Sequence, residues 1–106
     1  MRVTSFVQDR FLTLALCGEI DHHSAREIMR TITEKIDAFL PLRCVLDFRD
    51  VSFMDSSGIA VVIHAHRQMK TLQGTLLLQN IPPQPYKVLH AAGIEKITEI
   101  REECRP

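Results

Sequence analysis

Residues 43–63 read RCVLDFRDVSFMDSSGIAVVI, and this stretch decides the fold. Its first part, RCVLDF at 43–48, is short, β-branched and aromatic, which is typical of a strand covered on both faces. The polar run DSSG occupies 55–58, and a periodic apolar segment extends from about Ser57 to Gln73. The stretch therefore predicts a buried strand, a polar loop and a helix, in that order.

The segments on either side predict further strands and helices. Two alternating segments upstream predict a hairpin, and an apolar stripe with three- and four-residue spacing predicts a helix that Ser24 and Glu27 open as a capping box. The proline cluster IPPQP at 81–85 separates a further strand from a short helix. The expected strands are 3–7, 11–17 and 75–79, and the expected helices are 24–41, 57–73 and 85–93. The last segment, 94–100, has a spacing that suits a strand or a helix.

Each of the two long helices is expected to bury one apolar stripe. In the helix at 24–41 the stripe is Ile28, Met29, Ile32, Ile36 and Phe39. In the helix at 57–73, which Gly74 follows, the stripe is Ile59, Val62, Ile63, His66 and Met69.

This order of elements predicts an α/β fold. We expect one domain over residues 1–106, with a mixed β-sheet, helices packed against it, an N-terminal hairpin and right-handed crossovers. No repeat, low-complexity stretch or charge block marks a linker. The polar loop then lies at an end of the sheet, where α/β folds usually carry their chemistry.

The DSSG loop has two interpretations. In the first, Asp55, Ser56 or Ser57 is only the N-cap of the following helix and stabilises it by about 1 kcal/mol. That role leaves the other hydroxyl and Gly58 unexplained. In the second, a serine hydroxyl is a phosphorylation acceptor, because unpaired N–H groups and the helix dipole at a helix N-terminus favour a phosphate. Gly58 would then leave room for a foreign active site to approach the backbone.

Catalytic, metal and cofactor sites are not expected. The stretch lacks the GxSxG elbow of a serine hydrolase, and no base is assigned to Ser57. His22 and His23 could bind a metal, but no third and fourth ligand is assigned to them, and His66 is expected to pack rather than to bind a metal. Because no GxxxxGK loop is present, the chain is not expected to be a kinase or an NTPase, and no cofactor is predicted.

Composition limits the partners and the location. Thirteen basic side chains balance thirteen acidic ones, so neither direct nucleic-acid binding nor a polybasic membrane anchor is expected. The longest aliphatic run, IAVVI, is too short to span a bilayer, and the first residues lack a signal-peptide core, which favours a cytoplasmic protein. Three cysteines without CxxC spacing favour reduced thiols that pack.

Two segments together resemble a known family. GEIDHHSA at 18–25, followed by CVLDFRDVSFMDSSGIAVV at 44–62, resembles the STAS-domain anti-sigma-factor antagonists of bacteria, and the order of segments agrees over nearly the whole chain. The resemblance implies a binding protein rather than an enzyme. In that family, the unphosphorylated antagonist binds an anti-sigma factor that is also a serine kinase, and so releases the sigma factor. Phosphorylation by the kinase ends the interaction, and a serine phosphatase restores it.

The resemblance also implies the site residues. The phosphorylated serine of the family falls on Ser57, and the acidic residue of the family's GE-aliphatic-D segment falls on Asp21, on the kinase-facing surface. Asp21, Asp55, Ser56 and Gly58 are therefore predicted to bind the partner. One alternative is a structural STAS subunit of a larger signalling assembly, in which the same serine tunes packing between copies. Another is a small serine hydrolase, which the missing elbow glycine disfavours.

The C-terminus departs from the family pattern. Family members usually end with a further amphipathic helix, whereas this sequence stops at REECRP, so the terminal helix is expected to be truncated. A sheet or helix face would then be less covered than usual. A homodimer or another partner is expected to cover it.

Overall fold

The computed structural model describes residues 2–101. The elements are β1 (Arg2–Gln8), β2 (Phe11–Ile20), α1 (His22–Phe39), β3 (Arg43–Met54), α2 (Ser57–Thr71), β4 (Thr75–Gln79), α3 (Pro83–Ala91), the 3-10 helix η1 (Ile94–Lys96) and β5 (Glu99–Arg101). The sheet has the strand order β1-β2-β3-β4-β5, with β1 antiparallel to β2 and the other neighbours parallel. The predicted α/β fold with one mixed sheet and an N-terminal hairpin is confirmed.

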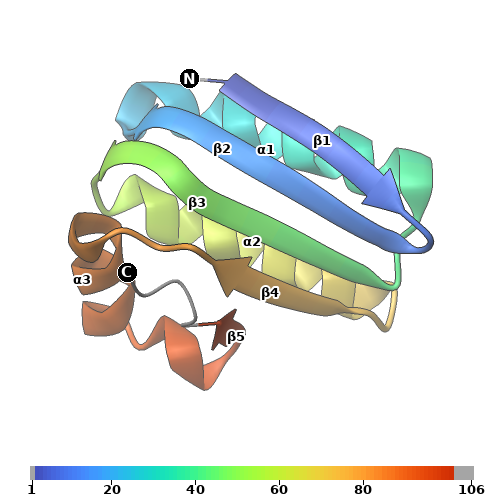
Figure 1. The fold of residues 1–106 in the computed structure, drawn as a ribbon. Coiled ribbons are helices and arrows are strands. Elements are labelled where there is room, and N and C mark those ends of the chain that lie inside the picture. Colours follow the sequence, from blue (N-terminus) through green and yellow to red (C-terminus); the bar gives the residue numbers. More distant parts are fainter. Residues whose placement is uncertain (1, 102–106) are drawn as a thin grey trace.

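The core lies between the sheet and the two long helices. Figure 1 shows α1 and α2 side by side on one face of the sheet. Every second residue of β2 points to this face, because strand side chains alternate, and α1 contributes one residue per turn. These side chains are Leu12, Leu14, Leu16, Ile28, Ile32 and Ile36. Phe39, predicted on the same stripe, is 47% exposed, because α1 ends there and Leu40 turns into the left-handed conformation.

β3 is longer than predicted. It continues through DVSFM to Met54, because the second half of β2 continues beside it and pairs Ile20 with Met54. The register shifts twice along this part, and Gly18, with a φ of 108°, lies at one shift, as suits a bulge. Only Asp55 and Ser56 therefore remain between β3 and α2.

The buried face of α2 matches the predicted stripe only in part, at Val62 and Met69. Its buried residues are Gly58, Val61, Val62, Ala65 and Met69, whereas Ile59, Ile63 and His66 are half-buried. The residue after α2 in the left-handed conformation is Gln73, with a φ of 61°, rather than the predicted Gly74. Gly74 is needed for packing instead, since a Cβ there would lie 2.6 Å from the carbonyl oxygen of Leu42.

The end of the described chain combines both predicted possibilities. Residues 94–100 form the short η1 and then the beginning of the edge strand β5. Residues 102–106 lie outside the described residues. The expectations of a truncated terminal helix and of a homodimer therefore stay predictions.

Candidate functional site

Two acidic residues follow the carboxyl ends of neighbouring parallel strands, at the same end of the sheet. Asp21 follows β2, Asp55 follows β3, and the residues before them, Ile20 and Met54, are partners in the parallel register. The N–H of Asp55 also donates to the carbonyl oxygen of Ile20 at 3.0 Å. Both acidic residues thus lie immediately before α1 and α2, and Figure 1 shows that these two helices begin at the same end of the sheet. The structure therefore brings the two predicted segments together.

Of the three residues predicted as possible caps of α2, Asp55 is the one whose side chain makes the capping bond. Its Oδ1 accepts a hydrogen bond of 2.8 Å from the N–H of Ser57, while Ser56, at the N-cap position, is exposed and makes no side-chain cap bond. The N–H groups of Gly58 and Ile59 donate to the carbonyl oxygens of Asp55 and Ser56, both at 3.0 Å. The expectation of unpaired N–H groups here is wrong for these three donors, because the loop already uses them.

The bonds of the loop do not use the hydroxyl of Ser57. Ser57 is half-buried at the first position of α2, and within residues 2–101 the bond that fixes it is the one from its backbone N–H to Asp55. A hydroxyl that the loop does not use can receive a phosphoryl group while the helix stays intact.

Asp21 caps α1. Its Oδ1 accepts hydrogen bonds from the N–H groups of His23 and Ser24, and the hydroxyl of Ser24 accepts one from the N–H of Asp21, each at 3.0 Å. The predicted capping box of Ser24 and Glu27 is therefore wrong, and Asp21 and Ser24 form the box instead. Residues 21–27 contain both possible patterns, and the carboxylate of Asp21 prevails because it satisfies two orphan donors at once.

Replacing Asp21 with asparagine is expected to change stability in acid. The hydrogen bond from the backbone N–H of Ser24 is the main reason that the pKa of Asp21 lies below its usual value of 3.8. A lowered pKa in the folded state stabilises the fold above pH 3.8, and this contribution is lost as the pH falls through the folded-state pKa. Asparagine still caps but does not titrate.

The measurement is thermal unfolding of both proteins from neutral pH into acid. Melting temperatures should agree at neutral pH, and the wild-type protein should lose stability more steeply below pH 3.8. Glu95, whose pKa is also lowered, chiefly by its own backbone N–H, is present in both proteins, so the difference isolates Asp21. Parallel acid curves would refute the role given to this carboxylate.

The structure gives Gly58 a packing role, and its predicted partner contact stays a prediction. Gly58 is buried, and a Cβ at this position would lie 2.2 Å from Sδ and 2.4 Å from Cγ of Met54. The space that its missing side chain leaves is therefore filled from inside the protein. Gly58 serves packing between α2 and the end of β3, and the exposed side of the loop belongs to Ser56.

Removing the carboxylate of Asp55 should destabilise the protein, whereas removing the hydroxyl of Ser56 should not. Asp55→Ala leaves the N–H of Ser57 without its 2.8 Å bond, which should cost about 1 kcal/mol. Ser56→Ala removes an exposed group that caps nothing, and should stay within about 0.5 kcal/mol of the wild-type protein. Urea unfolding of both variants checks this. Equal loss in the two variants would contradict the assigned cap.

The sequence analysis missed Gln84. Its side-chain amide accepts a hydrogen bond from the N–H of Met54 and donates one to the carbonyl oxygen of Met54, both at 2.8 Å. Met54 is the residue before Asp55, so α3 holds the end of β3 immediately before the loop. The one signal in the sequence was the proline cluster around Gln84, which by itself does not show what the side chain contacts.

The described residues give no catalytic base or metal centre at this site. No histidine within residues 2–101 hydrogen-bonds the hydroxyl of Ser57; His64, for example, lies 2.6 Å from the hydroxyl of Thr33. No group of three or more potential metal ligands is found in that range. Burial raises the pKa of the Cys44 thiol to about 12, which agrees with a packing role. No helix of residues 2–101 has the length and apolar character needed to cross a membrane.

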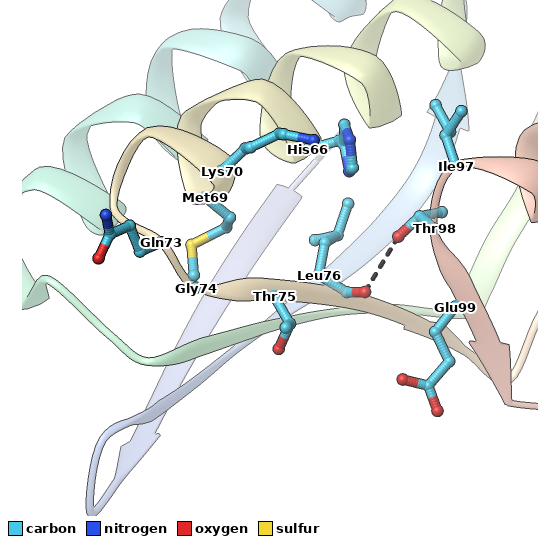
Figure 2. A pocket seen from close by; sticks show the side chains of 10 residues that line it. All are labelled: His66, Met69, Lys70, Gln73, Gly74, Thr75, Leu76, Ile97, Thr98 and Glu99. Carbon is cyan, nitrogen blue, oxygen red and sulfur yellow. Dashed lines mark hydrogen bonds between the residues drawn. The ribbon is translucent and has the colours of Figure 1, made fainter.

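A pocket of about 370 Å³ lies at the far end of α2 (Figure 2). Met69, Leu76 and Ile97 form apolar parts of its wall, and Figure 2 shows His66 beside Lys70 on the α2 side. The hydroxyl of Thr98 is engaged in a 3.0 Å bond to the carbonyl oxygen of Leu76. None of the predicted site residues lines this pocket, so it is separate from the Ser57 loop.

Comparisons with known proteins agree with the predicted family and fold. The family model described as the STAS domain matches residues 3–105. An anti-sigma F factor antagonist of Lysinibacillus sphaericus is 30% identical over 83 residues, which cover 78% of this chain and 71% of that protein. The solved structure of the anti-sigma factor antagonist SpoIIAA in its unphosphorylated form is 27% identical, with a TM-score of 0.80 over 96% of this chain and 90% of SpoIIAA.

A second SpoIIAA structure, of the Bacillus cell fate determinant in the phosphorylated form, is also 27% identical. Its TM-score is 0.72, over 96% of this chain and 93% of that one. The family model and these relatives confirm the resemblance that the two sequence segments indicated. The chain belongs to the STAS-domain family.

Proposed function

We propose that this protein is an anti-sigma-factor antagonist switched by phosphorylation of Ser57. In the unphosphorylated form it binds an anti-sigma factor that is also a serine kinase, and so releases a sigma factor. Phosphorylation by that kinase ends the contact, and a serine phosphatase restores it. The observation that supports the proposal is the position of Ser57, half-buried as the first residue of α2, with its backbone N–H rather than its hydroxyl bonded to the cap residue Asp55.

The charges around the loop explain how the switch works. A phosphate on Ser57 adds a charge of about −1.5 to −2 next to the carboxylate of Asp55. The first three N–H groups of α2 are already bonded, so they do not neutralise this charge. The phosphate therefore faces the partner as an uncompensated anion. Repulsion and desolvation then oppose docking, and no change of fold is required.

The role we propose is binding rather than catalysis. The kinase supplies the base and the Mg–ATP, and this chain supplies the acceptor hydroxyl and the docking surface. The balance of charges in the sequence agrees with a protein partner rather than a nucleic acid. We place the exchange in the cytoplasm, where sigma factors meet RNA polymerase.

A pull-down from cell extract, with and without ATP, tests the proposal. Without ATP the wild-type protein should retain an anti-sigma factor, and with ATP it should release that protein and gain one phosphate on the peptide covering residues 50–67. Ser57→Ala is the matched control and should retain the partner under both conditions. A phosphate found elsewhere, or capture of the same protein regardless of ATP by the wild-type chain, would refute the switch.

A further inference from the structure

The proposed switch leaves the proline cluster IPPQP, residues 81–85, without a role. Pro82 is the N-cap of α3, Pro83 is its first residue, and Pro85 is buried in its first turn. Each proline ring fixes φ near about −65°. The carbonyl oxygen of Pro82 also accepts a 3.0 Å bond from the N–H of Tyr86. The turn is therefore stiff, and it presents Gln84 from a fixed backbone.

Gln84 takes the place of a missing strand residue. β4 pairs with β3 only as far as Gln79 opposite Asp47, whereas β2 continues along the other edge of β3 to Met54. Within residues 2–101, the β4 edge of β3 thus has no strand partner beyond Asp47. The amide of Gln84 meets both polar backbone groups of Met54 at 2.8 Å, which is the pairing that a neighbouring strand would have supplied.

This contact lies directly beside the Ser57 loop. Met54 is the last residue of β3, and its buried side chain fills the space next to Gly58 of α2. On the opposite side, the N–H of Asp55 is bonded to the carbonyl oxygen of Ile20. The loop is therefore anchored to β2 by one backbone bond and to α3 by the two bonds of Gln84.

We propose that Gln84, held by the proline turn, is a positioning residue for the acceptor serine: it fixes the end of β3 so that Ser57 is presented in one geometry to the kinase. The inference rests on the proposed function and deepens it. A substrate hydroxyl must be placed in line with the transferred phosphoryl group, and a misplacement of about 1 Å costs roughly a hundredfold in rate. Gln84 contacts no reacting atom and acts through the backbone of Met54.

Three variants test the role of Gln84. Gln84→Ala removes both bonds. Gln84→Glu keeps the size of the side chain and the acceptor for the Met54 N–H, but sets a carboxylate oxygen against the carbonyl oxygen of Met54. Lys87→Ala, at an exposed position of the same helix, is the matched control. Melting curves establish that each variant is folded. If Gln84→Ala does not fold, Gln84→Glu alone is compared with the wild-type protein and with Lys87→Ala.

Hydrogen exchange of the isolated protein reports the local effect. The amide of Met54 should exchange at least about tenfold faster in both Gln84 variants, while amides of α1 and β4 keep their protection. Lys87→Ala should match the wild-type protein. Unchanged exchange at Met54 in both Gln84 variants would overturn the inference, because the side chain would then hold nothing.

Phosphorylation kinetics with the kinase captured by the pull-down report the functional effect. We expect kcat/KM for phosphate transfer to Ser57 to fall by roughly ten- to a hundredfold in both Gln84 variants, mainly through kcat. Wild-type kinetics in folded Gln84 variants would refute the positioning role and leave the switch intact. Absence of phosphate on Ser57 in the wild-type protein would instead refute the switch, and the inference with it.

Discussion

Ser57→Ala is expected to bind the anti-sigma factor as the wild-type protein does and to take up no phosphate, whereas Ser57→Asp should bind at least about tenfold more weakly, a loss of about 1.4 kcal/mol. The alanine variant loses only a hydroxyl and keeps the backbone N–H that bonds to Asp55. The aspartate adds a negative charge beside Asp55, where the first N–H groups of the helix are already engaged. Titration calorimetry with the captured partner gives both affinities.

Two controls make the comparison specific to Ser57. Lys87→Ala, at an exposed position of α3 outside the loop, should bind and be phosphorylated like the wild-type protein. Ser57→Asn, which adds a polar group of similar size to aspartate without charge, should bind more tightly than Ser57→Asp. If the asparagine and aspartate variants lose the same affinity, bulk rather than charge opposes docking and the electrostatic explanation is wrong.

Gly58→Ala is expected to be the most destabilising single-methyl change near the loop. The new Cβ would overlap Sδ and Cγ of Met54, whose side chain is fully buried and cannot move into solvent. Overpacking of this kind costs about 1–3 kcal/mol. In a domain of this size each kcal/mol lowers Tm by about 4–8 °C. Calorimetry at neutral pH measures the shift.

A double-mutant cycle with Met54→Ala identifies the cause. Met54→Ala alone leaves a cavity and should cost about 2–5 kcal/mol. In the Met54→Ala background the Gly58→Ala change should cost much less than in the wild-type protein, because the atoms that it overlaps are gone. If the two changes are additive, or if Gly58→Ala is at least as stable as the wild-type protein, contact with Met54 is not the reason that position 58 requires a glycine.

Local patterns in the sequence were sufficient to predict most of the fold. The alternation of Leu12, Leu14 and Leu16 predicts a strand with one buried face, and the spacing of Ile28, Ile32 and Ile36 predicts the buried stripe of α1. Each pattern lies within a single element, and each prediction is confirmed because the same side chains pack in the core. The place of the DSSG loop between a strand and a helix follows in the same way.

Features that depend on a distant segment were not predictable from local patterns. The extension of β3 to Met54 requires β2 to continue beside it, and the buried face of α2 is set by the fit of Gly58 against Met54 rather than by the largest apolar side chains. The contact of Gln84 joins residues thirty positions apart through a side-chain amide. The prediction of Ser57 as the phosphorylated serine came from the family resemblance, since the residues alone left Asp55, Ser56 and Ser57 as candidate caps.

The decisive measurement is the affinity of the captured anti-sigma factor for the protein phosphorylated fully on Ser57, compared with its affinity for the unmodified protein. We expect phosphorylation to cost about 3 kcal/mol of binding free energy, which is more than roughly a hundredfold in Kd, and to leave the far-UV circular dichroism unchanged. Equal affinities for the two forms would contradict it.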